Sequence, residues 1–323
     1  MRKFSPDISC PLGGSRAALS AKGDLGFASR IRAISAVAWI FLRRRKGWAT
    51  QLVKKVAAFR ARFSLGRRKM RGSAAIFILI AFSAARGQWI QVSSESEPSP
   101  LKGLEHRYLV AEHSQSGARA SLELAIFSTK ACRLRVIDQS SEPRVELEEM
   151  MNRGNFLAAV NGGYFDPEYR PIGLLIVDGA ILTPLQKARL LSGVLSASAK
   201  KVQIARVAEF SLIPKPDMAI ESGPMIIDLG KAVRGLESTR VARRTFAAVG
   251  AGDKAALGSC SDVTLADLSN ILATSLIADF KIQRVLNLDG GSSSAFWFKR
   301  ANGSAFSISE EKIVRDFVAV VPR

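Results

Sequence analysis

Residues 284–298 read Arg-Val-Leu-Asn-Leu-Asp-Gly-Gly-Ser-Ser-Ser-Ala-Phe-Trp-Phe, and other parts of the chain repeat their pattern. An apolar run stops at Asp289, glycines and serines follow, and a second apolar run begins at Ala295, which predicts a buried strand ending in a tight polar turn. Gly290 and Gly291 permit positive φ and the close approach of a ligand, and successive backbone N–H groups can form an anion nest beside the carboxylate. The stretch is either part of an active site or a hairpin turn in which Asp289 and the serines cap their own backbone.

The same pattern occurs earlier in the chain, where the apolar run 156–160 ends at Asn161-Gly162-Gly163-Tyr164-Phe165-Asp166. A plain turn explains the two glycines, but an aromatic pair beside a polar loop is typical of a surface on which a sugar stacks. A third polar break, Glu221-Ser222-Gly223-Pro224, interrupts the apolar run 219–228. We expect these breaks at strand ends to converge on one pocket.

Most of the remaining predicted elements are strands. They are expected at residues 108–111, 122–127, 134–137, 193–195, 202–205, 209–213 and 313–321. Hairpins are predicted at Asp178-Gly179 and Gly252-Asp253, where turn residues separate apolar runs. Helices are expected at 143–152, with Pro143 in the first turn, and at 264–274. These elements predict an α+β domain over residues 104–323, a mixed or antiparallel sheet with a few packed helices.

The region before residue 104 has a different composition. Residues 1–69 carry clusters of Arg and Lys and are interpreted as a disordered basic extension or a mis-annotated start, with translation beginning at Met70. Residues 70–87 combine a basic start, a twelve-residue apolar core and small residues, which predicts a signal peptide or an uncleaved membrane anchor. Residues 88–103 are polar and contain proline, which predicts a linker.

Charge and cysteine content exclude several classes of protein. Residues 1–72 hold 18 Lys and Arg against two Asp, so that +16 of the net charge of +19 lies there, and no nucleic-acid partner is expected for the domain. The histidines are His106 and His113, and the three cysteines have no metal-ligand spacing, which argues against a zinc site or a histidine-based triad. Cys132 and Cys260 are either one disulfide or two buried thiols.

Six segments, taken in order and spacing, resemble the phosphodiester glycosidase family over about residues 108–323. They are Asn161-Gly162-Gly163-Tyr164-Phe165, Ser222-Gly223-Pro224, Arg244-Thr245, the helix around Thr264, Asn287-Leu288-Asp289-Gly290-Gly291 with Ser293-Ser294, and a last strand with Arg315. Two positions depart from the family pattern. Ser292 stands where many members have a third glycine, and residues 258–262 replace an Asp-Gly pair, leaving Asp262 as the one carboxylate there. The resemblance implies hydrolysis of a sugar-1-phosphodiester at the anomeric carbon.

This chemistry needs a carboxylate at the anomeric carbon and a cationic or N–H-rich group for the departing phosphate. We therefore expect Asp289 to be the base, nucleophile or metal-holding carboxylate, with a divalent cation as an optional cofactor, and Arg244 to clamp the phosphate. Glu221 or Asp166 is the expected second acidic group. The expected substrate-binding residues are Asn161, Gly162, Gly163, Tyr164, Phe165, Ser222, Gly223, Gly290, Gly291, Ser292, Ser293 and Arg315.

The expected partner is a carbohydrate phosphodiester or glycan outside the cytoplasm, in the periplasm or medium, with a membrane tether through residues 70–87 as one arrangement. A rival hypothesis is a non-catalytic envelope module that uses the same pocket to bind a glycan or an anionic polymer. A third is a membrane-associated scaffold that works through the basic N-terminus.

Overall fold

The computed structural model describes residues 87–323 except residue 200 and residues 275–279. The basic extension, its Cys10 and all but the last residue of the signal-like segment therefore lie outside the described residues. Within the described part of the chain, no helix is long and apolar enough to cross a membrane.

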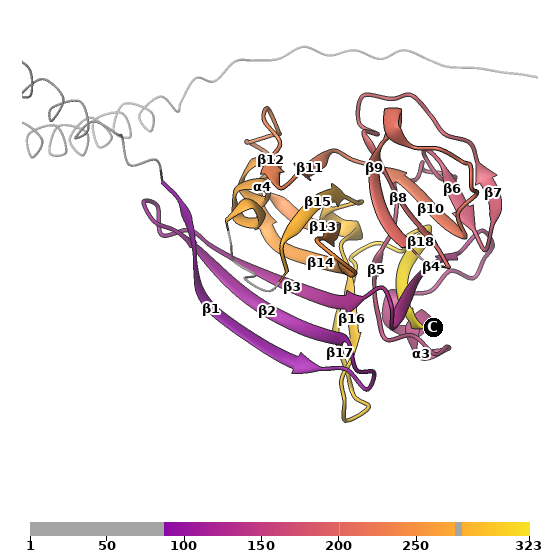
Figure 1. Ribbon diagram of the computed structural model, residues 1–323, viewed down its shortest axis with the longest axis horizontal. Helices are drawn as coiled ribbons and strands as arrows, with labels where there is room; N and C mark the ends of the chain where they lie inside the picture. Colours follow the sequence, from indigo (N-terminus) through magenta and orange to yellow (C-terminus); the bar gives the residue numbers. More distant parts are fainter. Residues whose placement is uncertain (1–86, 200, 275–279) are drawn as a thin grey trace, which may run out of the picture. The chain divides into compact units, whose positions relative to one another are not determined.

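An eight-stranded antiparallel sheet, the first sheet, forms the largest layer (Figure 1). Its long strands at one side, β1, β2 and β3, lie next to one another (Figure 1). In spatial order the strands are β1(Trp89–Pro98), β2(Leu104–His113), β3(Arg119–Ser128), β14(Lys254–Val263), β13(Ala242–Gly250), β15(Ile282–Asn287), β11(Met225–Asp228) and β12(Lys231–Ala232).

Two five-stranded antiparallel sheets complete the described fold. The second sheet has the order β7(Ala180–Thr183), β6(Leu175–Val177), β10(Met218–Ser222), β8(Gly193–Ser198) and β9(Lys201–Arg206). The third sheet has the order β17(Ala305–Ile308), β16(Phe296–Lys299), β5(Ala158–Asn161), β18(Asp316–Pro322) and β4(Cys132–Asp138). Short 3₁₀ turns, η2(Val207–Glu209) and η3(Gly291–Ser293), follow β9 and β15.

The main core lies where the three sheets meet. Ala125 of the first sheet, Ile220 of the second and Val160 of the third belong to one cluster of buried apolar side chains. Adjacent positions on a strand face opposite sides, so the other face of the first sheet has a core of its own, which α4(Leu265–Ala273) covers. The short helix α3(Leu147–Asn152) covers a third cluster against β5 and β16.

The fold is richer in strand than predicted. The expected antiparallel sheets are present, but the described residues contain only two α-helices, so the α+β expectation is reduced to a mainly β domain. Helix α4 begins as predicted, with the Thr264 side chain accepting a hydrogen bond from the Asp267 N–H. Helix α3 begins at Leu147 rather than near Pro143, and no strand forms at 209–213, where the chain leaves a 3₁₀ turn.

The N-terminal edge of the domain also differs from the prediction. Residues 89–98, expected in a linker, form β1 and pair with β2 along almost their whole length. The strand is polar because residues 90–96 are all exposed at the sheet edge, on both faces of the strand, so composition alone predicts a flexible segment. The hairpin at Asp178-Gly179 is confirmed, with φ of 45° and 78°. Cys132 and Cys260 are free, buried thiols.

Candidate active site

The Asp289 carboxylate lies directly after β15 and is partly exposed. Gly290 donates its N–H to Asp289 Oδ1 at 2.9 Å, and the chain then turns through η3, with Gly291 at φ 65°. Burial raises the pKa of Asp289 above its ordinary value, and hydrogen bonds from Ser293 and Gly290 together with the charge of Arg240 oppose this rise. The loop therefore presents a carboxylate that is held by its neighbours and reachable from solvent.

Asn161 connects this loop to the third sheet. Its Nδ2 donates to the Asp289 carbonyl at 2.9 Å, while its Oδ1 accepts from Thr245 Oγ1 at 2.7 Å and from the Ala295 N–H at 3.0 Å. The side chain is fully buried. The prediction gave Asn161 contacts with sugar hydroxyls, but the structure uses its amide to join β5, β13 and the Asp289 loop.

The two glycines after Asn161 pack against a residue that the sequence reasoning did not select, Asp316. Gly162 accepts the Asp289 N–H at its carbonyl, and Gly163 donates its N–H to Asp316 Oδ1 at 2.9 Å. A Cβ added to Gly162 would lie 1.7 Å from Asp316 Oδ1, so this position requires glycine. Burial raises the pKa of Asp316 to about 7, and the charges of Asp138 and Asp289 add to that rise.

Tyr164 joins the turn after β5 to the break after β10. Its hydroxyl donates to the Gly223 carbonyl at 2.5 Å and accepts from Asn287 Nδ2 at 3.0 Å. Burial and the nearby Asp289 charge raise the pKa of Tyr164 to about 12, so the phenol stays protonated. Gly223 itself has no room for a side chain, because an added Cβ would lie 2.2 Å from the Leu190 carbonyl oxygen. The second sheet is thereby attached to the Asp289 loop.

Arg244 also lies at this loop. Gly290 packs beside its Cα and Cδ, and its guanidinium donates to the Val263 carbonyl at 3.0 Å and to the Arg240 carbonyl at 2.5 Å. These contacts fix the 237–240 turn, whose Arg240 is exposed and lowers the pKa of Asp289 by its charge. The sequence reasoning missed Arg240 because a single exposed arginine in a polar loop carries no pattern.

Other expected site residues have contacts elsewhere. Glu221 is fully buried, and its Oε2 accepts the N–H groups of Leu174 and Gln186 at 2.8 and 2.9 Å. Asp166 forms an ion pair with Arg170 at 2.7 Å in an exposed loop, which lowers its pKa. In the structure, Glu221 and Asp166, the two expected acidic partners of Asp289, thus contact groups of their own surroundings.

Three further expected binding residues are also held by the fold. Phe165 stacks on Tyr169 with ring centroids 5.2 Å apart and packs against the core under α3. Arg315 donates to Asp138 Oδ1 at 2.7 Å and to the Tyr169 carbonyl at 2.8 Å. Ser222 is fully buried with its hydroxyl unpaired.

The loop around Ser292 faces the C-terminal segment. The Ser292 carbonyl accepts the N–H groups of Glu311 and Lys312 at 2.7 and 3.2 Å, which anchors η3. In the described part of the chain no three His, Cys, Asp or Glu side chains are grouped to hold a metal ion.

This arrangement agrees with comparisons to known proteins. Residues 154–321, just over half of the chain, match the phosphodiester glycosidase family. This chain belongs to the phosphodiester glycosidase family. The expected family is confirmed, and the matched residues include all three strand-end breaks.

Two individual proteins are informative comparisons for this member of the family. The catalytic domain of zebrafish N-acetylglucosamine-1-phosphodiester alpha-N-acetylglucosaminidase, solved auto-inhibited by its pro-peptide, has a similar fold, with a TM-score of 0.53 and 15% identity over 72% of this chain and 89% of that one. The uncharacterized protein YigE of Escherichia coli K12 is 31% identical over 91 residues, which are 26% of this chain and 36% of YigE. The chain thus matches little more than a third of the length of YigE.

Proposed function

We propose that this chain hydrolyses a sugar-1-phosphodiester at the anomeric carbon of an envelope glycan or glycoconjugate. The observation that carries the proposal is Asp289, a partly exposed carboxylate at a strand end, held by Gly290 and Ser293 with the Arg240 charge acting on it. Membership of the phosphodiester glycosidase family supports this reaction class.

In the proposed reaction, the bond between the anomeric carbon and the phosphate oxygen breaks, and the bonding electrons leave with the phosphate. Asp289 stabilises the positive charge that develops on the sugar, either electrostatically or as a nucleophile. Water supplies the hydroxyl of the product sugar, and its other proton is released to solvent. The phosphomonoester that departs is a weak base, so it needs no proton from a second carboxylic acid. This agrees with the structure, in which Glu221 accepts a backbone N–H and Asp166 pairs with Arg170.

The arginines have separate parts in this proposal. Arg240 holds the departing phosphate, because it is exposed and its charge reaches both Asp289 and Tyr164. Arg244 positions the turn that carries Arg240 and adds positive charge beside Gly290. A phosphate between these groups is stabilised as its negative charge grows.

The test is turnover of a chromogenic sugar-1-phosphodiester by the wild type and by Asp289→Asn. We expect a loss of at least about a thousandfold in the variant, because one preorganised charged group is commonly worth two to three orders of magnitude and Asp289 also meets the reacting carbon. Retained binding without turnover in the wild type would support the rival glycan-binding module. Equal activity of both proteins would overturn the role of Asp289.

We also propose that the domain acts outside the cytoplasm, on the basis of the signal-like residues 70–87. Mass spectrometry of the mature N-terminus from the native cell is the direct test. Peptides from residues 1–69 in the mature protein would contradict cleavage after this segment.

A further inference from the structure

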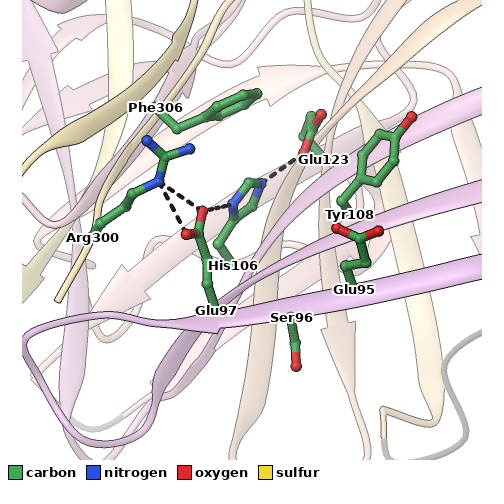
Figure 2. Close-up of a pocket in the computed structure, with 8 residues that line it drawn as sticks. All are labelled: Glu95, Ser96, Glu97, His106, Tyr108, Glu123, Arg300 and Phe306. Atoms are coloured by element: carbon green, nitrogen blue, oxygen red, sulfur yellow. Dashed lines mark hydrogen bonds and ion pairs between the residues drawn. The ribbon is translucent and has the colours of Figure 1, made fainter. Parts of the chain in front are cut away.

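A cavity of about 360 Å³ lies on the first sheet beside the β16–β17 hairpin, away from Asp289 (Figure 2). Its lining residues come from β1, β2, β3, the β17 strand and the turn before it: Glu95, Ser96, Glu97, His106, Tyr108, Glu123, Arg300 and Phe306. The three strands precede residue 154, where the family match begins. Six of the eight lining residues therefore lie outside the family match, while Arg300 and Phe306 lie within it.

One wall of the cavity is rigid. His106 Nδ1 lies 2.8 Å from Glu97 Oε1, and Nε2 lies 2.6 Å from Glu123 Oε2, as Figure 2 shows. A neutral imidazole donates from one nitrogen only, so both contacts are satisfied when the ring is protonated. The ring packs on Phe306 at a centroid distance of 5.0 Å, and Arg300 donates to the Glu97 carboxylate. The groups of this wall are thus fixed before any ligand arrives.

The other wall offers free polar groups. In Figure 2 the Glu95 carboxylate lies beside the base of the Tyr108 side chain, the Tyr108 hydroxyl points away from it, and no interaction is drawn from either residue to the others. Carboxylate and phenol oxygens accept from sugar hydroxyls, Arg300 donates to them, and the Phe306 ring offers an apolar surface. Three carboxylates against Arg300 and a protonated His106 leave one excess negative charge, which disfavours a phosphorylated or acidic sugar.

The strand register connects this cavity to the Asp289 site. Glu95, Tyr108, Glu123, Ser259 and Thr245 are directly paired across five neighbouring strands, so their side chains share one face of the sheet. Thr245 is the residue whose hydroxyl bonds Asn161. With strands about 4.8 Å apart, Glu123 lies two strands, or roughly 10 Å, from Thr245, and Glu95 roughly 19 Å.

We propose that this cavity binds an uncharged sugar unit of the same glycan whose phosphodiester is cleaved at Asp289. The inference rests on the proposed function, because it assigns the cavity to the same substrate. It makes the enzyme selective for a polymer that crosses the protein surface between the cavity and Asp289, because Ser259 and Thr245 of the row are themselves buried and give the separation of the two sites rather than a path for the glycan.

The experiment is a binding screen of the full chain on an array of uncharged oligosaccharides of glucose, mannose and N-acetylglucosamine, followed by titration calorimetry of the best binder. Glu95→Gln and Tyr108→Phe should each weaken its binding at least tenfold. Ser94→Ala is the matched control, because Ser94 is exposed, does not line the cavity and faces the opposite side of β1 from Glu95, so its loss should leave affinity unchanged. Thermal melting confirms that each variant folds.

Turnover of the short chromogenic phosphodiester separates this inference from the proposed function. That substrate does not extend to the cavity, so Glu95→Gln and Tyr108→Phe should leave its rate unchanged. Oligosaccharide binding without turnover would leave the cavity assignment standing and overturn the proposed function. The cavity assignment is overturned if no uncharged oligosaccharide binds, if both variants bind it as well as the wild type, or if anionic sugars alone bind there.

Discussion

At the residue scale, the Asp289 site shows how few of its polar side chains are free for a ligand. Asn161, Tyr164 and Arg244 each bond groups from other strands or turns, so they hold the site together. Asp289 and Arg240 are the charged groups that remain partly or fully exposed. The residues that touch substrate are therefore fewer than the family motifs suggest.

The division between the arginines is tested by alanine substitutions. Arg240→Ala should lower kcat/KM for the sugar-1-phosphodiester about a hundredfold, because the departing phosphate loses its exposed cation. Arg243→Ala is the matched control, since Arg243 pairs with Glu311 at 3.2 Å and bonds the Ser309 carbonyl. Equal losses in the two variants would refute the phosphate role of Arg240.

Asp316 gives a prediction for stability. Its pKa rises from 3.8 to about 7 on folding, so the folded state holds this proton more tightly than the unfolded state. Protonation of Asp316 therefore stabilises the folded state fully below pH 3.8, and this contribution is lost as pH rises through about 7. The free energy of unfolding changes by up to about 4 kcal/mol over this range. Asp316→Asn should remove this decline while an amide oxygen still accepts the Gly163 N–H. Urea unfolding across this pH range measures it, and identical pH slopes would contradict the assignment.

At the element scale, the sequence predicted the strand-end turns because glycine, serine and carboxylate residues interrupt apolar runs visibly. It could not predict β1, since an edge strand with an exposed face has the composition of a linker. It also could not show that Glu221 turns into the protein and accepts two N–H groups, because that depends on the loop packed over β10. Which carboxylate faces solvent is decided by tertiary contacts.

His106 connects β2 to Glu97 of β1, and its protonation makes the free energy of unfolding depend on pH. Burial alone would lower the pKa of His106, but its hydrogen bonds and charge interactions with Glu123 and Glu97 raise it above 6.5. Protonation of His106 therefore stabilises the folded state fully below pH 6.5. This contribution is lost as pH rises through the higher pKa that His106 has in the folded state. His106→Gln should cost about 3 to 5 kcal/mol at acidic pH, where a buried ion pair is broken, and less at alkaline pH.

Denaturant unfolding of His106→Gln at several pH values measures this effect. His113→Gln serves as the control, because the chain's other histidine bonds Ser116 near the end of β2 and contacts no carboxylate in the described contacts. A cost for His106→Gln that stays constant with pH would show that the ring stabilises β1 by packing alone.

At the scale of the whole molecule, three antiparallel sheets meet, and hydrogen bonds of Asn161 and Asn287 connect the ends of β5, β10 and β15. The order of motifs in the sequence was enough to predict the family. The layering was not predictable, because it depends on pairings such as β3 with β14, which are 126 residues apart at Ser128 and Lys254. The cavity in Figure 2 is likewise visible only after these strands pair.

The central claim is that the bond broken is the one at the sugar's anomeric carbon, and hydrolysis in oxygen-18-labelled water tests it most directly. Mass spectrometry of both products shows which one takes up the solvent oxygen. We predict the label in the released sugar and none in the phosphate, because water replaces phosphate at carbon. Label in the phosphomonoester would show cleavage at phosphorus, and would contradict a glycosidase reaction at Asp289.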